Sequence, residues 1–521
     1  MRERRPMYAG EDRGVARRNV RWSALLLIVF SAYYIFQGTL GTFGTLSWNT
    51  SYYDLLERGF ADGHLYIPTK PRRALLRQVD PYSSTHEHMW LWDASLYRGR
   101  YYMYFGPTPA LCLWAFKAIS GTDQRVFDQW LVLVFMLGRL FAGATLILSV
   151  ANRRGVRQPI WAILLAISVW ALASPTPYMM ARPVVYEAAI ASGQCFLFSG
   201  LVAALWGFSQ RRWRDVLFVL AGICWTFALA SRGSLILVAP LLALLTTASI
   251  AWRERSWSTA VRSLFALATP IGLGLVAYGY YNYERFDSPF EFGLTYQLTG
   301  RPFMNANEYL MPNVVSYAAA NLKWSCHFPY ARLAVRRHRT HLIDWPDDYD
   351  IGSDWNGERV AGVFVATTFC WLGLLWIWRA SRWWRSREHD DSVAPLAFLE
   401  STQLWLLLCS LACSCALLPV LRMYMANMRF LEDGIGGLLI AAMLGGFWLI
   451  DWSRRATRPL LRAFGPTAYV LLALHTSVIG VLLGFTGQND NFESENADLF
   501  GALASKLSVC RSHPATSVHT R

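Results

Sequence analysis

Asp93 has the surroundings that best suit acid–base chemistry in this sequence. It lies in WLWDASLYRGRYYMYFGPTPALCLW, residues 90–114, among tryptophans, tyrosines and arginines. An apolar aromatic setting removes water from a carboxylate and raises its pKa, which brings the group toward the range of a useful general base. An ion pair with Arg98 or Arg100 would instead make the same carboxylate structural, and the sequence leaves both roles open.

A second acidic group follows shortly after the first apolar run. In NTSYYDLLERGFADG, Asp54 and Glu57 fall on one face of a short amphipathic helix that ends at Gly63. Either carboxylate could accept a proton from a substrate. The alternative is a solvated interfacial helix that its tyrosines anchor among the lipid headgroups.

Several ionisable residues lie within or beside apolar segments. Charge is costly in a membrane, so such residues default to a functional hypothesis. They are Arg139, Arg182, Glu187, Arg232, Arg429, Glu432 and Asp433. The topology given below brings Arg182, Arg232 and Arg429 to the outer face, where guanidinium forks would suit a phosphate or pyrophosphate. Pairing of Arg429 with Glu432 or Asp433 at helical spacing is the structural alternative.

The composition is that of a membrane protein. Of the 521 residues, 54% are hydrophobic and only 16% are charged, unlike a soluble globular domain. Much of the net charge of +14 comes from short arginine clusters between apolar runs, as in NRRGVRQ and RASRWWRSR. This pattern marks cytoplasmic loops. It argues against a nucleic-acid partner, because no cluster belongs to a soluble domain that could form a binding face.

The apolar runs predict an all-α polytopic membrane protein with about eleven transmembrane helices. A basic cytoplasmic N-terminus covers residues 1–21, the multi-pass domain covers 22–485, and a polar C-terminal tail covers 486–521. An odd number of spans places this tail outside. The predicted spans are 22–42, 126–150, 160–174, 185–208, 216–231, 235–252, 266–281, 360–378, 404–421, 430–450 and 467–485.

Two large loops, about 45–125 and 282–359, then lie outside and contain short interfacial helices. The stretch PTPALCLWAFKAIS is too short to span a bilayer and predicts a re-entrant or interfacial helix. The second loop combines aromatic rings with Asn, Gln and Asp, which suits either a sugar-handling surface or a plain interfacial cap. Binding and catalytic residues are often carried by long loops, so we expect the functional site in these two.

The sequence does not firmly imply any cofactor or metal ligand, and it leaves dependence on a divalent metal open. His86 and His88 lie in STHEHMW, which lacks the helical i, i+4 spacing of zinc-protease motifs. Most cysteines fall inside apolar runs and act as small packing residues. Only Cys326 and Cys510 fall in segments predicted to be exterior, so a disulfide between them stays open.

The layout resembles the GT-C superfamily of integral-membrane glycosyltransferases, especially its polyprenyl-phosphate-sugar-dependent branch of bacterial protein mannosyltransferases and aminoarabinose transferases. The matching stretches, after the acid-bearing first loop, are FGPTPALCLWAFKAISG, QWLVLVFMLGRLFAGATLILSVANRRG, SPTPYMMARPVVYEAAIASGQ and GICWTFALASRGSLILVAPLL. In addition, LWDASLYRGRYYMYFGPTPAL with NYERFDSPFEFGLTYQLTG is similar to a group of bacterial multi-pass proteins. The resemblance covers about the first 330 residues and the remainder loosely.

The resemblance implies inverting transfer of a sugar from a polyprenyl-phosphate donor to an envelope glycan, lipid or protein acceptor, at the outer face of a bacterial inner membrane. Carried over by position, the base is Asp54. The family's acid ahead of the tyrosine pair is replaced here by the residues at 49–51, which makes Asp93 its rival or its partner in one shared site. The substrate-binding residues are then Arg182, Arg232, Arg429, Glu187, Arg100, Tyr101 and Tyr102.

The sequence leaves two other classes of protein open. A transporter or flippase of a lipid-linked glycan should carry polar residues deep in several helices and some repeat symmetry, whereas here the polar groups concentrate in the outer loops. A non-catalytic envelope scaffold would keep the same fold with a decayed site, and the missing acid at residues 49–51 keeps this alternative open.

Overall fold

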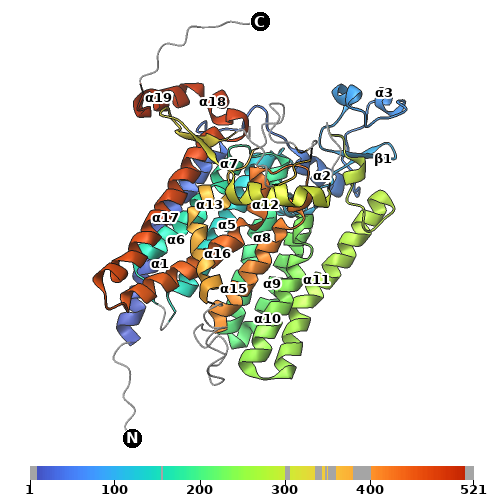
Figure 1. Ribbon diagram of the computed structural model, residues 1–521. Coiled ribbons are helices and arrows are strands. Elements are labelled where there is room, and N and C mark those ends of the chain that lie inside the picture. Colours follow the sequence, from blue (N-terminus) through green and yellow to red (C-terminus); the bar gives the residue numbers. More distant parts are fainter. Residues whose placement is uncertain are drawn as a thin grey trace.

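The computed structural model describes residues 9–153, 157–299, 305–334, 343–346, 349, 359–379 and 401–510. Helices dominate this part of the chain, and its strands form two short hairpins. The long helices lie alongside one another as one bundle, with most of the short elements gathered at one end of it (Figure 1). The predicted all-α polytopic class is confirmed.

Eight helices in the described residues are long and apolar enough to cross a membrane. They are α1 (Ala9–Gly38), α5 (Asp128–Ala151), α8 (Val185–Ser209), α10 (Val238–Glu254) with η3 (Gly233–Leu235) before it, α11 (Trp257–Phe286), α15 (Ser401–Ser414) with η7 (Cys415–Leu417) and η8 (Val420–Arg422) after it, α16 (Met428–Arg454) and α17 (Pro459–Thr486).

Three of the predicted spans are shorter or interrupted. The first two are α6 (Ile160–Leu172) and α9 (Arg214–Leu229). The predicted span 360–378 begins as α13 (Val363–Ala366) and the 3-10 helix η6 (Thr368–Leu374), because Thr367 between them leaves the helical region of backbone space. The total of about eleven spans therefore stays a prediction.

Helix α16 forms the centre of the bundle, since 89% of its most apolar window is buried. Its glycines allow neighbouring helices to approach closely. A Cβ atom on Gly436 would lie 2.5 Å from the ring of Phe198, and one on Gly446 would lie 2.6 Å from the ring of Tyr469. Arg429, Glu432 and Asp433 near the start of α16 are therefore held inside the protein instead of facing lipid.

The first predicted exterior loop folds into short elements. These are α2 (Tyr52–Ala61), α3 (Arg73–Leu76), η1 (Ser84–Met89), the hairpin of β1 (Ser95–Tyr97) and β2 (Arg100–Tyr102), and α4 (Thr108–Ser120). The amphipathic helix predicted before Gly63 is confirmed as α2. Helix α4 confirms the short apolar helix, and it exposes Trp114, Phe116 and Ile119. Its location at a membrane surface stays a prediction.

The second predicted exterior loop and the C-terminal segment lie at the same end of the bundle (Figure 1). The loop contains η4 (Leu294–Tyr296), η5 (Asn307–Tyr309), α12 (Leu310–Ala319) and the hairpin of β3 (Leu322–Trp324) and β4 (Ala331–Leu333). The segment predicted as a polar tail contains η9 (Gln488–Asp490), α18 (Asn491–Glu495) and α19 (Ala497–Leu507). The remaining described elements are α7 (Pro175–Met180) and η2 (Arg211–Trp213).

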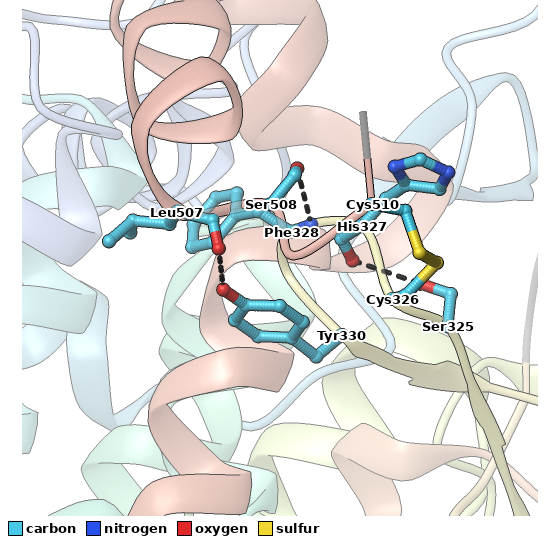
Figure 2. Close-up of a disulfide and its surroundings, with 8 residues drawn as sticks. All are labelled: Ser325, Cys326, His327, Phe328, Tyr330, Leu507, Ser508 and Cys510. Carbon is cyan, nitrogen blue, oxygen red and sulfur yellow. Dashed lines mark hydrogen bonds between the residues drawn. A yellow bond between two sulfur atoms is a disulfide. The ribbon is translucent and has the colours of Figure 1, made fainter. Parts of the chain in front are cut away.

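A disulfide joins this C-terminal segment to the β3–β4 hairpin. Figure 2 shows the bond between Cys326 and Cys510, whose Cα atoms are 5.5 Å apart. Beside it, the backbone N–H of Phe328 donates to Oγ of Ser508 at 3.1 Å, and the Tyr330 hydroxyl donates to a backbone carbonyl of α19. The disulfide that the sequence left open is confirmed.

Candidate functional site

A cavity of about 290 Å³ lies at the loop end of the bundle. It is bounded by the segment between β2 and α4, the start of α8, the α9–η3 connection, the end of α11 with the loop after it, and the connection between α15 and α16. Aromatic rings form much of its wall: Tyr104, Phe105, Tyr186, Tyr278, Phe292 and Tyr424. Apolar walls with a few placed polar groups are typical of small-molecule sites.

Two of the predicted arginines line this cavity. Arg232 follows α9 in extended conformation, and Arg429 lies in the first turn of α16. The side chain of Asn427 caps α16 by accepting from the backbone N–H of Arg429 at 2.9 Å, which fixes where the helix begins. The fold therefore brings together two guanidinium groups that lie about 200 residues apart in the chain.

Arg232 is held by a forked contact with Asp433. Its Nη2 lies 2.6 Å from Oδ2 and its Nε lies 3.3 Å from Oδ1. The Asp433 side chain is fully buried, and that of Arg232 is 14% exposed. Two parallel charge-assisted bonds fix both the position and the plane of the guanidinium. The group that would meet a ligand in the cavity is thus oriented before the ligand arrives.

Glu187 links the other two predicted arginines. Its Oε1 lies 3.7 Å from Nη1 of Arg429 and 3.5 Å from Nη1 of Arg182. The guanidinium carbon of Arg429 lies 4.1 Å from the centre of the Tyr186 ring, within the range of a cation–π contact. Arg429 is therefore fixed from two sides, whereas Arg182 reaches Glu187 without lining the cavity.

The acids of α16 bind arginines on other helices. Asp433 binds Arg232, and Glu432 lies 2.8 Å from Nε of Arg139 on α5. Both side chains of the latter pair are fully buried, and Oγ1 of Thr176 donates to Glu432 at 2.9 Å. Glu432 and Asp433 thus bind arginines on other segments, which helical spacing did not indicate.

Asp93 lies directly behind the cavity wall. Its Oδ1 accepts a hydrogen bond from the hydroxyl of Tyr186, and Nε2 of Gln297 lies 3.5 Å from the same oxygen. Tyr186 and Gln297 both line the cavity. Arg98, the counter-ion that the sequence suggested, binds Asp287 at 2.8 Å, and Arg100 stacks on Tyr66.

The backbone holds Asp93 in place. Its φ of 58° is in the left-handed region, where aspartate is found more often than most residues. The backbone N–H of Asp93 donates to the carbonyl of Leu298 at 3.1 Å, and that of Leu298 donates to Ala94 at 2.9 Å. The Tyr52 hydroxyl donates to the carbonyl of Trp92. A residue that both helix α2 and the loop around Leu298 hold in a turn is pre-positioned for whatever its carboxylate does.

Asp54 occupies a different place. Its Oδ1 accepts from Nζ of Lys117 at 2.7 Å and from the backbone N–H of Val126 at 3.0 Å, and its Oδ2 accepts from Arg58 at 2.9 Å. Lys117 also donates to Glu57 at 2.6 Å. Burial by itself would lower the pKa of Lys117, but the hydrogen bonds to the two carboxylates raise it, so the amine stays charged.

The expectation that Asp54 and Asp93 share one site is therefore wrong. Asp54 does not line the cavity, and its side chain is 1% exposed. Its contacts identify it as the anchor between α2 and α4.

Besides Arg182 and Glu187, three predicted substrate-binding residues lie outside the cavity wall. Arg100, Tyr101 and Tyr102 all belong to strand β2. Tyr101 accepts from the backbone N–H of Ile67 and Tyr102 packs on Phe286. Strand β2 thus supports the loop that carries Asp93.

Sequence reasoning missed Tyr186 and Gln297 as site residues. The signal for Tyr186 was its position next to Glu187 in VVYEAA, and Gln297 lies in LTYQLTG, one of the stretches that carried the resemblance. Neither signal shows that the two side chains meet Asp93. In the described part of the chain, no group of three or more His, Cys, Asp or Glu side chains could hold a metal ion.

No family model and no curated protein matches this chain. Among solved structures it is similar to the archaeal oligosaccharyltransferase AglB from Archaeoglobus fulgidus in complex with an inhibitory peptide and a dolichol-phosphate, at 13% identity and a TM-score of 0.47, over 90% of this chain and 56% of that one. A structure of the A. fulgidus enzyme tethered with an acceptor peptide gives 12% identity and a TM-score of 0.43, over 95% and 59%.

The chain thus spans between half and two thirds of the length of these proteins. At this identity the likeness assigns no substrate to the chain.

Proposed function

We propose that this protein is a membrane glycosyltransferase that moves a sugar from a polyprenyl-phosphate donor to an envelope glycan, lipid or protein acceptor. The observation that carries the proposal is the cavity, which gathers Arg232 and Arg429 in an aromatic wall with the carboxylate of Asp93 behind it. The aromatic wall can bind a sugar ring, the arginines can bind a phosphate, and the carboxylate can accept a proton.

The two arginines would bind the donor phosphate and stabilise it as it leaves. Arg232 is fixed by Asp433 and Arg429 lies between Glu187 and Tyr186. Groups that are already oriented need no reorganisation when charge develops, which is where electrostatic catalysis gains most. The paired carboxylates also keep the unoccupied site close to neutral, which limits the cost of burying two arginines.

The reaction is a single displacement. The oxygen or nitrogen of the acceptor attacks the anomeric carbon of the sugar, and the bond from that carbon to the phosphate oxygen breaks. The electron pair leaves with the polyprenyl phosphate, next to Arg232 and Arg429. The acceptor's proton passes to Asp93. Because attack and departure occur on opposite faces of the sugar, the configuration at the anomeric carbon inverts.

Two observations support an outer-face site in a bacterial inner membrane with a cytoplasmic N-terminus. Helix α19, which the disulfide between Cys326 and Cys510 follows, lies at the loop end of the bundle (Figure 1), and disulfides persist in oxidising compartments. The turn between α10 and α11, with Arg253 and Arg255, lies at the opposite end together with the N-terminus. Arginine clusters mark the cytoplasmic side.

The sugar is best identified first in cells. Profiling the lipid-linked sugars and envelope glycans of a deletion strain should reveal accumulated donor and missing product. The full-length protein in detergent or nanodiscs is then assayed with that polyprenyl-phosphate sugar. A deletion strain that loses no glycan would favour the scaffold alternative. A protein that moves the lipid-linked glycan across a vesicle membrane without releasing polyprenyl phosphate would favour the flippase alternative.

Three variants test the site. We expect Asp93→Asn, Arg232→Gln and Arg429→Gln each to lower kcat/KM by about 10²-fold or more, the usual effect of losing a general base or a transition-state donor. Arg98→Gln is the matched control, because this exposed arginine on the same loop binds Asp287 away from the cavity. Wild-type activity in all three variants would show that the chemistry occurs elsewhere.

A further inference from the structure

We propose that Tyr186 relays the acceptor's proton to Asp93, so that the carboxylate acts through a phenol and need not touch the acceptor. This inference rests on the proposed function and adds a further catalytic residue to it. It concerns the route from the cavity to the base, which neither the sequence nor the resemblance addresses.

The route follows from which groups face the cavity. Tyr186 is among the described residues that line the cavity, and Asp93 is not. The hydroxyl of Tyr186 donates to Oδ1 of Asp93. An acceptor bound in the cavity therefore meets the phenol oxygen first, and the carboxylate is one hydrogen bond further on.

The phenol is fixed in this position by its neighbours. The guanidinium carbon of Arg429 lies 4.1 Å from the centre of the Tyr186 ring, and the ring of Phe105 meets it edge-on at 4.8 Å. On the other side, the backbone N–H of Asp93 donates to the carbonyl of Leu298, which holds the residue that carries the carboxylate. The arginine proposed to bind the phosphate thus packs on the ring proposed to carry the proton, which couples the two ends of the reaction.

The proton steps balance without any further reactant. As the acceptor oxygen forms its bond to the anomeric carbon, its proton moves to Oη of Tyr186. The proton of Tyr186 moves to Oδ1 of Asp93. The bond between the anomeric carbon and the phosphate oxygen breaks and its electron pair leaves with the phosphate. The phenol ends neutral, as it began, and Asp93 ends protonated.

The test compares Tyr186→Phe with Asp93→Asn in the polyprenyl-phosphate-sugar assay. Tyr186→Phe should lower kcat by about 10²-fold, at the lower end of what general base catalysis contributes, and should leave the KM for the donor nearly unchanged. Tyr469→Phe is the matched control, because that buried tyrosine of α17 also donates one hydrogen bond, to the carbonyl of Ala162, and neither residue lines the cavity.

Two readouts separate a relay from a structural role. Rates are measured in mixtures of H₂O and D₂O. A plot of rate against deuterium fraction should be curved for the wild type, because two protons move, and straight for Tyr186→Phe. The double variant with Asp93→Asn should be no slower than the slower single variant, because both residues serve one proton path.

Folding of Tyr186→Phe is checked by its binding of polyprenyl phosphate alone. Any of four results would overturn the relay. They are wild-type kcat in this variant, a straight deuterium plot for the wild type, additive losses in the double variant, or lost binding of polyprenyl phosphate. In those cases Asp93→Asn would still be inactive and the proposed function would stand. An inactive wild type would overturn the proposed function together with the relay.

Discussion

Replacing Lys117 by methionine tests whether Asp54 is a structural carboxylate. Nζ of Lys117 lies 2.7 Å from Asp54 and 2.6 Å from Glu57. The three side chains are 8%, 1% and 5% exposed. Methionine fills a similar volume and removes the charge, so it leaves two buried carboxylates. Asp54 keeps Arg58 at 2.9 Å, whereas Glu57 loses its ion-pair partner.

The expected loss of unfolding free energy is large. Removing one partner of a buried ion pair costs about 3–5 kcal/mol, because the other charge stays buried without compensation. The side chain of Arg58 is 49% exposed, so it compensates Asp54 only in part, and we expect about 3 kcal/mol. Adding Glu57→Gln to Lys117→Met removes one uncompensated charge and should recover part of this loss.

The stability that Lys117 contributes should fall at high pH. Hydrogen bonds to the carboxylates raise the folded-state pKa of Lys117 although burial opposes them. A raised lysine pKa gives stability that is fully present below the unfolded value of about 10.4 and is lost as the pH rises through the folded value. On the alkaline side, the difference in unfolding free energy between wild type and Lys117→Met should therefore shrink as the pH rises through the folded-state pKa of the lysine.

The measurement is denaturant unfolding of the full chain in detergent, followed by tryptophan fluorescence, with transfer activity assayed on the same samples. Asp54→Asn serves as the paired variant and should be less stable than wild type but active once folded. If Lys117→Met unfolds like the wild type, the ion-pair reasoning is refuted. If Asp54→Asn is as stable as wild type and inactive, Asp54 belongs to the chemistry after all.

Two further predictions concern the interior and the disulfide. Glu432→Gln leaves fully buried Arg139 facing a neutral partner and should cost about 3–5 kcal/mol, seen as faster thermal inactivation; a variant at wild-type stability would show that the pair contributes nothing. Non-reducing peptide mapping should recover Cys326 joined to Cys510 and leave the other cysteines open to thiol labelling after unfolding, whereas free thiols at both positions in protein from the cell envelope would contradict the proposed exterior location.

Local patterns in the sequence were sufficient for the helices of this protein. A backbone in lipid must satisfy its own hydrogen bonds, so an apolar run of sufficient length becomes a helix whatever its neighbours are. Helices α2 and α4 followed from equally local signals, namely an amphipathic pattern before Gly63 and a proline-led apolar run too short to span. The length of the two exterior loops likewise predicted where the polar side chains of a functional site would lie.

The partners of the charged groups could not be read in this way. Helical spacing put Glu432 and Asp433 within reach of Arg429, yet they bind Arg139 and Arg232 on other segments. Asp54 looked like a base from its position after the first helix, and only the fold brought Lys117 against it.

The same holds for the candidate base. The sequence identified Asp93 by its aromatic neighbours, whereas the bond from Tyr186 depends on the fold, which brings the start of α8 against the loop before β1. The sequence thus determined which segments become helices and which become loops, because period and length are properties of a single segment. The tertiary structure decided which carboxylate meets which cation, because that depends on how helices rotate and pack against one another.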